Sequence, residues 1–467
     1  MKPEQIDTTE FRDHLSNVTE AGKRIWIYPR IIKGLLYKYR TVFSWFLMLL
    51  LFGLPWIEID GHPYFMFNVI ERKFIFFGVM FFPQDFHLVA IGLLTFIVFI
   101  ILFTVIFGRV WCGWACPQTI FMEMLFRKIE NWIEGDYKAQ QRLDASPWTQ
   151  EKILKKTAKH TIFFVLSFII ANTFLAYLIG KQELWTIVSD DPSRHVGSLA
   201  SMILFTSVFY FVFARFRELV CIVVCPYGRL QGVLLDKKSI VVAYDYVRGE
   251  PRGKQTKVVA EIPKGDCIDC KICVQVCPTG IDIRNGTQLE CIGCTACIDA
   301  CDEVMVKIDK PIGLIRYDSL DGIENKTKLK FNLRIKAYSA VLAALLGVLV
   351  YLLLSRNMME TTILRTPGLT YQENKNGTVS NLYSVEVMNK STTSMPVNFA
   401  LKDFPKGKIK LIGKPLFLNA GELTKGSFFI EIPKKDLPDN TFKLEVEVYS
   451  NGKLIDHVKT SFLGPME

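Results

Sequence analysis

Five long apolar stretches constrain the fold of this chain more than any other feature. None of them contains a charged residue, and each approaches the roughly 20 residues that a helix needs to cross a bilayer core. A buried helix of a soluble protein is the alternative for any single stretch, but five stretches with charged flanks favour membrane spans. We therefore predict transmembrane helices at 41–57, 88–107, 161–179, 196–213 and 337–354. The apolar stretch 74–82 is too short to span, and we expect it at the outer interface.

The composition agrees with a chain that is partly membrane and partly water-facing. Half of the residues are hydrophobic and the mean hydropathy is +0.23, which is too apolar for an ordinary soluble enzyme. Charged residues still make up 22%, as in soluble proteins. The net charge of +10 does not indicate a nucleic-acid partner, because no basic run is interleaved with aromatic residues.

Lysine and arginine predict the orientation of the spans. Residues 1–40, 109–160 and 214–336 hold eight, nine and twenty of them, whereas 58–87 and 181–195 hold two each. The lysine- and arginine-rich segments face the cytoplasm by the positive-inside rule. We therefore expect a cytoplasmic N-terminus and a C-terminal region on the opposite side. No cleaved signal peptide is expected, because the first apolar stretch begins forty residues into the chain.

The last part of the chain, 355–467, has the pattern of a small β-domain. Apolar and polar residues alternate in short runs separated by Asn-Gly and Pro-rich turns, as in half-buried strands. The runs are 383–387, 408–412, 427–432 and 442–449. Their spacing predicts an all-β immunoglobulin-like sandwich without a paired disulfide. No catalytic constellation is evident in it, so we expect a docking or structural role.

Eight of the twelve cysteines form two CxxCxxCxxxC runs between the fourth and fifth spans. In such ferredoxin-like runs three thiolates hold one [4Fe–4S] cluster, and the fourth cysteine holds the other cluster. Zinc is disfavoured, since its sites use CxxC pairs without a third cysteine at the same step. Asp302 stands where the second run would have proline. The predicted ligands are Cys267, Cys270, Cys273 and Cys301, which we term the first quartet, and Cys277, Cys291, Cys294 and Cys297, the second quartet.

The other four cysteines form two CxxxCP pairs, each just after a span that runs inward. They are Cys112 and Cys116, and Cys221 and Cys225, which we term the thiol tetrad. The i, i+4 spacing predicts both sulfurs of a pair on one helical face, with the helix ending near the proline. Four packed thiols without a ligand, a zinc site and a Cu(I) site all remain open, and thiolates favour Cu(I) over Cu(II). A membrane haem is disfavoured, since no histidine lies in the middle of a span.

Several motifs resemble the cytochrome c oxidase accessory proteins of the CcoG, FixG and RdxA family. The similar segments are RVWCGWACPQTIFMEMLFRKIE at 109–130, RELVCIVVCPYGRLQ at 217–231, RGEPRG at 248–253, and the cysteine runs at 267–286 and 291–304. The resemblance implies a multi-pass protein of the bacterial inner membrane, with two cytoplasmic [4Fe–4S] clusters and a periplasmic C-terminal domain. It also implies reduction of Cu(II) to Cu(I) for assembly of cbb3-type oxidase, with the tetrad handling copper as substrate.

We therefore expect a five-helix transmembrane bundle, a ferredoxin-like domain and a C-terminal sandwich. The expected divisions are an N-terminal segment 1–40, helices one to four at 41–216, the cluster-bearing loop 217–336, the fifth helix at 337–354 and the sandwich 355–467. Expected partners are the lipid bilayer, a cytoplasmic electron donor, and proteins of copper transport and oxidase assembly; a homodimer is left open. Two other functions remain: an electron carrier similar to NapH-like and NosR-like proteins that binds no copper, and a non-catalytic assembly platform.

Overall fold

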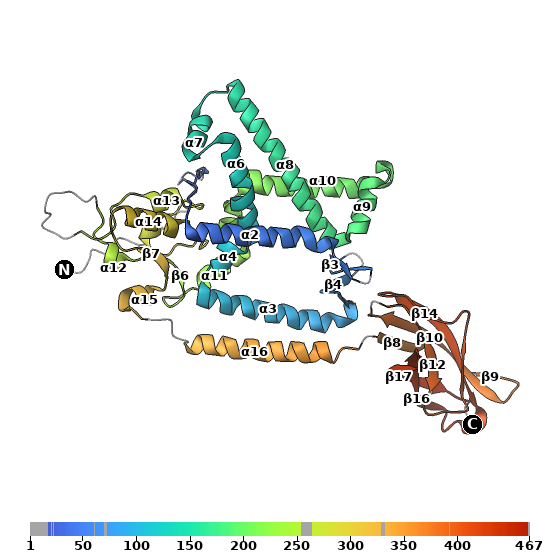
Figure 1. Cartoon of the computed structure of the whole chain (residues 1–467). Helices are drawn as coiled ribbons and strands as arrows, with labels where there is room; N and C mark the ends of the chain where they lie inside the picture. The colour runs from blue at the N-terminus through green and yellow to red at the C-terminus, as the bar shows by residue number, and fades with distance from the viewer. Residues whose placement is uncertain are drawn as a thin grey trace. The chain divides into compact units, whose positions relative to one another are not determined.

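The computed structural model describes residues 17–465, except 20, 22, 60, 70, 71, 254–263, 328–331, 358 and 392. The predicted N-terminal segment 1–40 therefore lies partly outside the described residues. The chain forms two compact units. The first contains the residues up to 53 together with 91–175 and 182–347, and the second contains 54–90, 176–181 and the residues from 348 onward (Figure 1).

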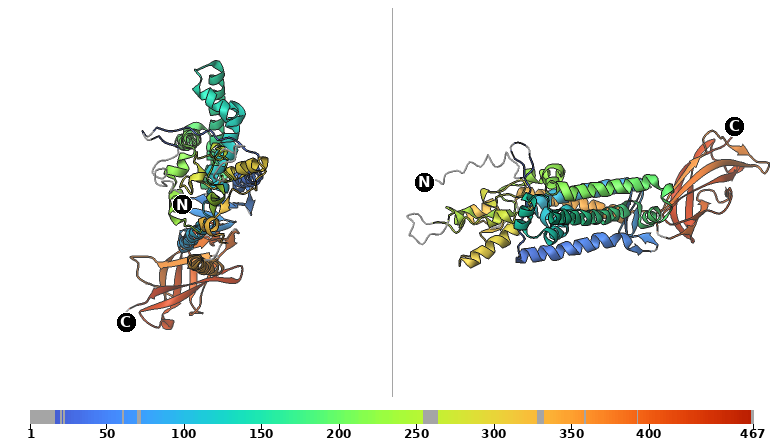
Figure 2. Two further views of the ribbon diagram at one scale, coloured as in Figure 1. Left: turned by 90° about the vertical axis from the view of Figure 1, so that its left-hand side faces the viewer. Right: turned by 90° about the horizontal axis from the view of Figure 1, so that it is seen from above.

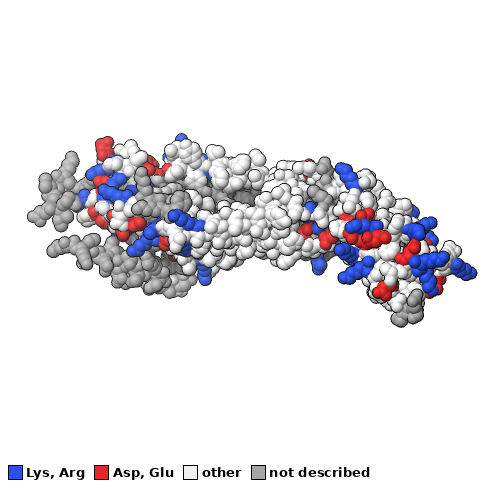
Figure 3. All heavy atoms as spheres, turned by 90° about the horizontal axis from the view of Figure 1, so that it is seen from below, with Lys and Arg blue, Asp and Glu red and all other residues white. Residues whose placement is uncertain are grey.

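Five helices among the described residues are long and apolar enough to cross a membrane by length and composition. The long helices run along one direction in the right-hand view of Figure 2, but Figure 1 shows that the helix at Gln150–Ile179 crosses the others obliquely. On the face drawn in Figure 3 few charged side chains lie over these helices, and charges gather elsewhere. The spanning segments are Leu35–Trp56, Pro83–Phe107, Gln150–Ile179, Val196–Phe216 and Leu333–Leu354. They consist of α2 (Leu35–Gly53) with η1 (Leu54–Trp56), η2 (Pro83–Asp85) with α3 (Phe86–Phe107), α8 (Gln150–Ile179), α10 (Val196–Phe211) with the π-helical η5 (Val212–Phe216), and α16 (Leu333–Leu354).

Helix α8 begins at residue 150, where the sequence predicted a start at 161. Its first turns are polar, so the apolar pattern did not reveal them. Lys156 pairs with Glu134 at 3.0 Å and with Asp144 at 2.5 Å, and Lys159 pairs with Glu134 at 2.8 Å. These acidic residues belong to α6 (Arg127–Glu134) and α7 (Tyr137–Ala145), which therefore stabilise the extended start of α8.

Helix α2 also begins before the predicted start, because a distant carboxylate caps it. Asp299 accepts hydrogen bonds from the backbone N–H groups of Leu36 at 3.2 Å and Tyr37 at 2.7 Å. A carboxylate at this position satisfies otherwise unpaired N–H groups and suits the positive end of the helix dipole. Asp299 lies on α14 (Ala296–Lys307), so this contact fastens α2 to the cysteine-rich part of the first unit.

The stretch 74–82 belongs to a small β-sheet in the second unit. Strands β3 (Phe65–Asn68), β4 (Lys73–Phe76) and β5 (Val79–Phe81) pair antiparallel in that order. The buried side chains of Ile75 and Met80 lie opposite each other in the register. The prediction of a lone interfacial segment missed this pairing, because strand partners are set by register and not by apolar length.

The cysteine-rich part of the first unit combines short helices with one strand pair. Strands β6 (Val241–Tyr244) and β7 (Ile315–Asp318) pair antiparallel and enclose the two cysteine runs in the sequence. A buried core of aliphatic side chains and thiols joins this pair to α14 and α13 (Ile272–Gln275). The remaining helices of the unit are α4 (Val110–Trp114), α5 (Pro117–Ile120), η3 (Phe121–Phe126), α9 (Lys181–Ser189), η4 (Pro192–Arg194), η6 (Val220–Val224), α11 (Pro226–Leu234), α12 (Tyr246–Gly249), η7 (Ile283–Asn285) and α15 (Leu320–Asn325).

The C-terminal part of the second unit is a sandwich of two antiparallel sheets. One sheet has the order β13-β15-β10-β8, with β9 also paired to β10, and the other has the order β12-β16-β17. Side chains of both sheets share one core, in which Val385, Phe428, Val446 and Phe462 are fully buried. The predicted runs overlap four of these eight strands, and β8, β9, β12 and β17 contain none of them. The strands are β8 (Met359–Arg365), β9 (Gln372–Glu373), β10 (Thr378–Asn389), β12 (Asn398–Leu401), β13 (Lys408–Leu411), β15 (Leu423–Pro433), β16 (Thr441–Ser450) and β17 (Lys453–Leu463).

Candidate functional site

Each CxxxCP pair lies at a bend between two short helices. Cys112 belongs to α4, but Cys116 has extended backbone angles (φ −64°, ψ 123°) and precedes α5, which begins at Pro117. In the second pair Cys221 belongs to η6, and Cys225 (φ −71°, ψ 110°) precedes α11. The prediction of one helical face is therefore wrong. Proline disfavours helical angles in the residue before it, but suits the first position of a new helix.

The bends bring the four thiols of the tetrad together. The pKa of Cys221 is raised to about 12, mainly by burial and with smaller contributions from the neighbouring thiols of Cys116, Cys112 and Cys225. Burial likewise raises the pKa of Cys112 to about 11. The Cys112 thiol donates a hydrogen bond to Oε1 of Gln231 at 3.0 Å. The tetrad is thus a group of buried and half-buried thiols, in which the raised pKa values of Cys112, Cys116 and Cys221 favour the protonated form when no metal is bound.

The first quartet draws together residues from both cysteine runs. The pKa of Cys301 is raised to about 12, mainly by burial and with smaller contributions from the neighbouring Cys273, Asp302, Cys267 and Cys270. Cys301 thus lies beside three cysteines of the earlier run, although it closes the later run in the sequence. The predicted crossover assigns these four neighbouring cysteines to one cluster, and this assignment stays a prediction.

The second quartet is grouped in the same way, with Cys277 beside the later run. Burial raises the pKa of Cys297, and the neighbouring Cys294, Cys291 and Cys277 add to the effect. Cys273 of the first quartet is the next contributor, so the two quartets are neighbours. Backbone N–H groups of Gly293 and Ala296 donate to Cys291 and Cys294 respectively. Such N–H···S bonds stabilise thiolates, and they help to set the reduction potential of an iron–sulfur cluster.

Both quartets fit a [4Fe–4S] cluster in their chemistry. Each consists of four thiols in a largely apolar surrounding, and a cluster of this kind takes four cysteine thiolates. When bound, each cluster supplies a store for one electron. Across the part of the chain that the structure describes, no three His, Cys, Asp or Glu side chains are arranged to hold a single metal ion. This finding applies to the thiol tetrad as well as to the quartets.

The first CxxxCP pair packs directly against the loop of the second quartet. A Cβ atom added to Gly113 would lie 2.6 Å from the carbonyl oxygen of Ile292 and 2.7 Å from that of Gly293. Cys112, Ile292 and Cys294 belong to one buried cluster of side chains. The tetrad and the second quartet are therefore adjacent, with no intervening layer of structure.

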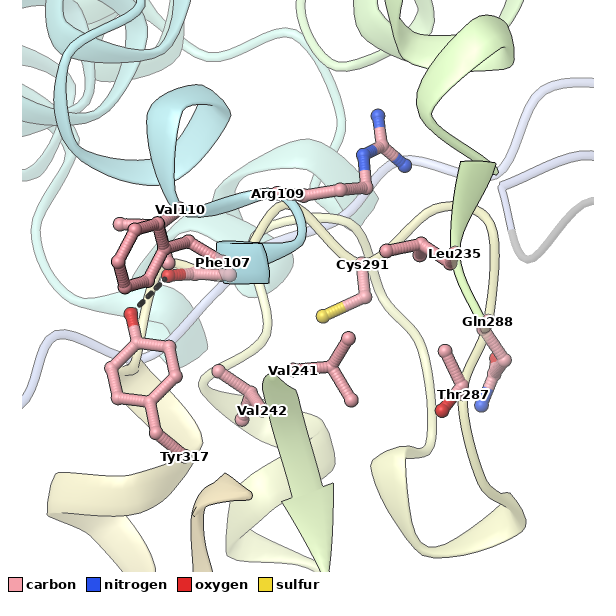
Figure 4. Close-up of a pocket in the computed structure, with 11 residues that line it drawn as sticks. Phe107, Arg109, Val110, Leu235, Val241, Val242, Thr287, Gln288, Cys291 and Tyr317 are labelled. Atoms are coloured by element: carbon pink, nitrogen blue, oxygen red, sulfur yellow. Dashed lines mark hydrogen bonds between the residues drawn. The ribbon is translucent and has the colours of Figure 1, made fainter. Parts of the chain in front are cut away.

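A chain of hydrogen bonds also connects these two segments. Nε1 of Trp114, inside the first CxxxCP pair, donates to the Tyr317 hydroxyl at 3.1 Å. That hydroxyl donates to the carbonyl oxygen of Gly293 at 3.1 Å, as Figure 4 shows. Cys291, Arg109 and Tyr317 line a cavity of about 20 Å³ from three different segments, which is room for one water molecule.

Comparisons with known proteins agree with this arrangement. A family profile described as a 4Fe–4S dicluster domain matches residues 216–320, which contain both quartets. A 4Fe–4S binding domain profile matches 89–137, and the profile of the immunoglobulin-like fold at the C-terminus of FixG matches 349–465.

Three relatives illustrate the range of similarity. The nitrogen fixation protein FixG of Rhizobium meliloti is 32% identical over 466 residues, which cover 88% of this chain and 87% of the relative. Protein RdxA of Cereibacter sphaeroides is 35% identical over 384 residues, covering 78% and 80%. YccM of Escherichia coli, named as an electron transport protein, is 24% identical over 254 residues, covering 50% and 60%.

The chain belongs to the FixG/RdxA family. The predicted family and the immunoglobulin-like C-terminal fold are thereby confirmed. This member of the FixG/RdxA family is a membrane iron–sulfur redox protein, as the 4Fe–4S profiles and the apolar helices indicate. Sequence reasoning assigned no role to Arg109, Gln231 or Tyr317 of the FixG/RdxA chain, although all three lie at the tetrad or the second quartet. Arg109 and Gln231 stand within the quoted motifs, which was the only signal available.

Proposed function

We propose that the protein passes single electrons through the two quartets to Cu(II), and releases Cu(I) for assembly of a cbb3-type cytochrome c oxidase. The observation that carries this proposal is the direct contact between α4 and the loop of the second quartet. Through it, thiols that favour Cu(I) lie next to an iron–sulfur ligand set. Electron transfer across such a contact needs no conformational change of the protein.

The reaction balances as a one-electron exchange. A low-potential one-electron donor on the cytoplasmic side is oxidised by one electron, and one Cu(II) is reduced to Cu(I). Copper that binds the tetrad would displace thiol protons to solvent, and release of Cu(I) would break the copper–sulfur bonds and return the protons to the thiols. Soft thiolates stabilise Cu(I) more than Cu(II), so copper held at the tetrad is easier to reduce than copper in water.

The proposal places the quartets and the tetrad on the cytoplasmic side and the sandwich in the periplasm of a bacterial inner membrane. The lysine- and arginine-rich segments support this orientation. The proposed partners are the cytoplasmic donor and proteins of copper transport and oxidase assembly, with the sandwich as the docking domain.

The experiment uses the full chain, purified anaerobically and reduced, with Cu(II) added beside a colorimetric Cu(I) indicator. The wild-type protein should yield about two Cu(I) per chain without further reductant, because two clusters store one electron each. Replacing both Cys112 and Cys221 by serine exchanges soft ligands for hard ones, so the yield should fall while cluster absorbance persists. Val223→Ser is the matched control, since it adds a hydroxyl between Cys221 and Cys225 and removes no thiol. Full Cu(I) yield from the double variant would overturn the role of the tetrad.

One observation favours a second function, that of an electron carrier without copper. The 4Fe–4S binding domain profile covers Cys112 and Cys116, and YccM is named for electron transport. In that case the wild-type protein should reduce a one-electron acceptor dye, but the Cu(I) yield should be no greater than with free dithiol. The copper assay therefore separates the two functions.

A further inference from the structure

The two cysteine runs fold into matching loops. In each loop the second cysteine, Cys270 or Cys294, lies between two residues with positive φ, and the residue after it is the N-cap of a helix, α13 or α14. The φ angles are 54° at Asp269, 56° at Lys271, 67° at Gly293 and 65° at Thr295. We term the segments 267–271 and 291–295 the 270 loop and the 294 loop. They are equivalent parts of one structural repeat.

The 294 loop is covered by the first CxxxCP segment. A Cβ atom added to Gly113 would lie 2.7 Å from the carbonyl oxygen of Gly293. A Cβ atom added to Gly293 itself would lie 3.3 Å from the carbonyl oxygen of Arg109. Cys294 is buried and Thr295 is 1% exposed. A partner in solution therefore cannot reach this loop.

The 270 loop has the same backbone conformation but is open to solvent. Cys270 is the one exposed cysteine among the twelve, all of which the structure describes. Asp269 has a side chain that is 39% exposed, at the position where the covered loop has Gly293. Lys271 is exposed at the position where the covered loop has the buried Thr295. Of two equivalent loops, one thus contacts the membrane-embedded part of its unit and the other faces water.

The open loop is a fixed and basic surface. Asp269 pairs with the guanidinium group of Arg284, whose side chain is 5% exposed and which also pairs with Asp282 at 2.6 Å. Lys271 forms no ion pair within the described part of the chain, and its side chain is exposed. The segment 214–336 holds twenty lysines and arginines against sixteen aspartates and glutamates. The charge of the loop therefore suits an acidic partner.

We propose that the 270 loop is the docking surface for the electron donor, and that this donor is a soluble one-electron carrier protein with an acidic face. The equivalent 294 loop is already occupied by α4, so the open loop is the one left for a partner from solution. Electron transfer slows steeply with distance, because the electronic overlap of donor and acceptor decays. A carrier docked at the exposed Cys270 therefore comes within reach of the first quartet.

The step is a simple electron exchange. The carrier loses one electron and the cluster held by the first quartet gains it, while no bond forms or breaks and no proton moves. This inference rests on the iron–sulfur part of the proposed function and needs no copper. It gives the two loops different tasks: the 270 loop receives electrons, and the 294 loop passes them toward the thiol tetrad.

The test measures binding and does not depend on turnover. The probe is an oxidised, acidic [2Fe–2S] ferredoxin, and the full chain is used in detergent with its iron content measured. Wild-type protein should bind the probe, and added salt should weaken binding because it screens exposed charges. Hydrogen exchange should slow in the 270 loop when the probe is bound, and should stay unchanged in the 294 loop.

Charge variants locate the docking surface more closely. Lys271→Glu should weaken binding on the order of tenfold, because it reverses a charge at the rim of the small interface typical of electron-transfer complexes. Lys271→Arg keeps the charge and should bind like the wild-type protein. Lys453→Glu makes the same charge change at the exposed start of β17 and is the matched control. Reduced methyl viologen, a small donor that needs no docking, should reduce wild type and Lys271→Glu to the same extent.

Several results would overturn the inference. They are the absence of ferredoxin binding to wild type, binding that is insensitive to salt, slowed exchange outside the 270 loop only, and equal binding by Lys271→Glu and Lys453→Glu. Tighter binding of a basic carrier protein than of the ferredoxin would also overturn it. Failure of the copper assay alone would leave these results unaffected, whereas a wild-type chain without iron would overturn the proposed function itself.

Discussion

The carbonyl oxygen of Ile292 lies 2.6 Å from the point where a side chain on Gly113 would begin. Gly113 stands between Cys112 and Cys116, and Ile292 stands between Cys291 and Cys294. The missing side chain at residue 113 therefore allows one CxxxCP pair to touch a cluster-binding loop. Backbone atoms form the opposing surface, and they cannot move aside as the end of a flexible side chain can.

Gly113→Ala should separate the tetrad from the second quartet. The added methyl group meets two carbonyl oxygens within 2.7 Å, so α4 or the loop must shift. We expect a lower thermal midpoint and slower electron delivery to an added acceptor, measured by thermal unfolding and stopped-flow absorbance. Gly92→Ala, where no atom lies within 4 Å of the added carbon, is the matched control and should be neutral. Unchanged kinetics in Gly113→Ala would show that the contact does not carry electrons.

Glu130→Gln should destabilise the first unit. Glu130 pairs with Arg217 and, at 3.3 Å, with Lys159, and all three are buried. Removing the one acid leaves two buried cations without that partner, a change that typically costs about 3–5 kcal/mol. A clear fall in the thermal midpoint in detergent is expected. Glu151→Gln, on the exposed part of α8, should have almost no effect. Equal midpoints for the two variants would contradict a structural role for Glu130.

The same ion pair should be insensitive to mild acid. Burial raises the pKa of Glu130, but the charges of Arg217 and Lys159 outweigh burial and lower it to about 2. A lowered pKa contributes stability that is complete above the ordinary value of 4.5 and is lost as the pH falls toward 2. The difference in thermal midpoint between wild type and Glu130→Gln should therefore be constant from about pH 8 to about pH 5. A difference that shrinks within this range would show that Glu130 takes up a proton there.

Iron content should separate the two quartets. The intact protein should contain about eight iron atoms, and Cys273→Ser or Cys301→Ser should alter the same cluster. Cys277→Ser and Cys297→Ser should together affect the other cluster. Iron analysis with EPR spin counting distinguishes the two groups. If Cys301→Ser alters the signal that Cys297→Ser alters, each run holds its own cluster and the crossover is wrong.

A reporter that is active only in the periplasm tests the proposed orientation. Fused after Leu354, at the end of α16, it should be active, because the sandwich is placed outside the cytoplasm. Fused at Lys264, between β6 and Cys267 of the first quartet, it should be silent. The opposite pattern would place the quartets on the oxidising side of the membrane.

Some features of the fold were predictable because neighbouring residues in the sequence encode them. Apolar length revealed the five apolar helices, cysteine spacing indicated a region that binds two 4Fe–4S clusters, and period-two alternation revealed the β-character of the C-terminal part. The predicted helix boundaries were wrong where a polar segment continued a helix beyond its apolar part. Helix α8 extends through a lysine-rich start because Glu134 and Asp144, from other helices, pair with it. The sequence pattern within 150–160 does not indicate that these residues pair with Glu134 and Asp144.

The sequence by itself therefore determined the apolar stretches and the family of this protein, and it predicted the ligand sets. Only the tertiary structure decided that the CxxxCP pairs bend, that α4 meets the loop at Ile292, and that Asp299 caps α2 from 263 residues away. The physical reason is that ligand spacing is encoded in neighbouring residues. Burial and electrostatic surroundings, in contrast, are set by segments that are distant in sequence and meet only when the chain packs.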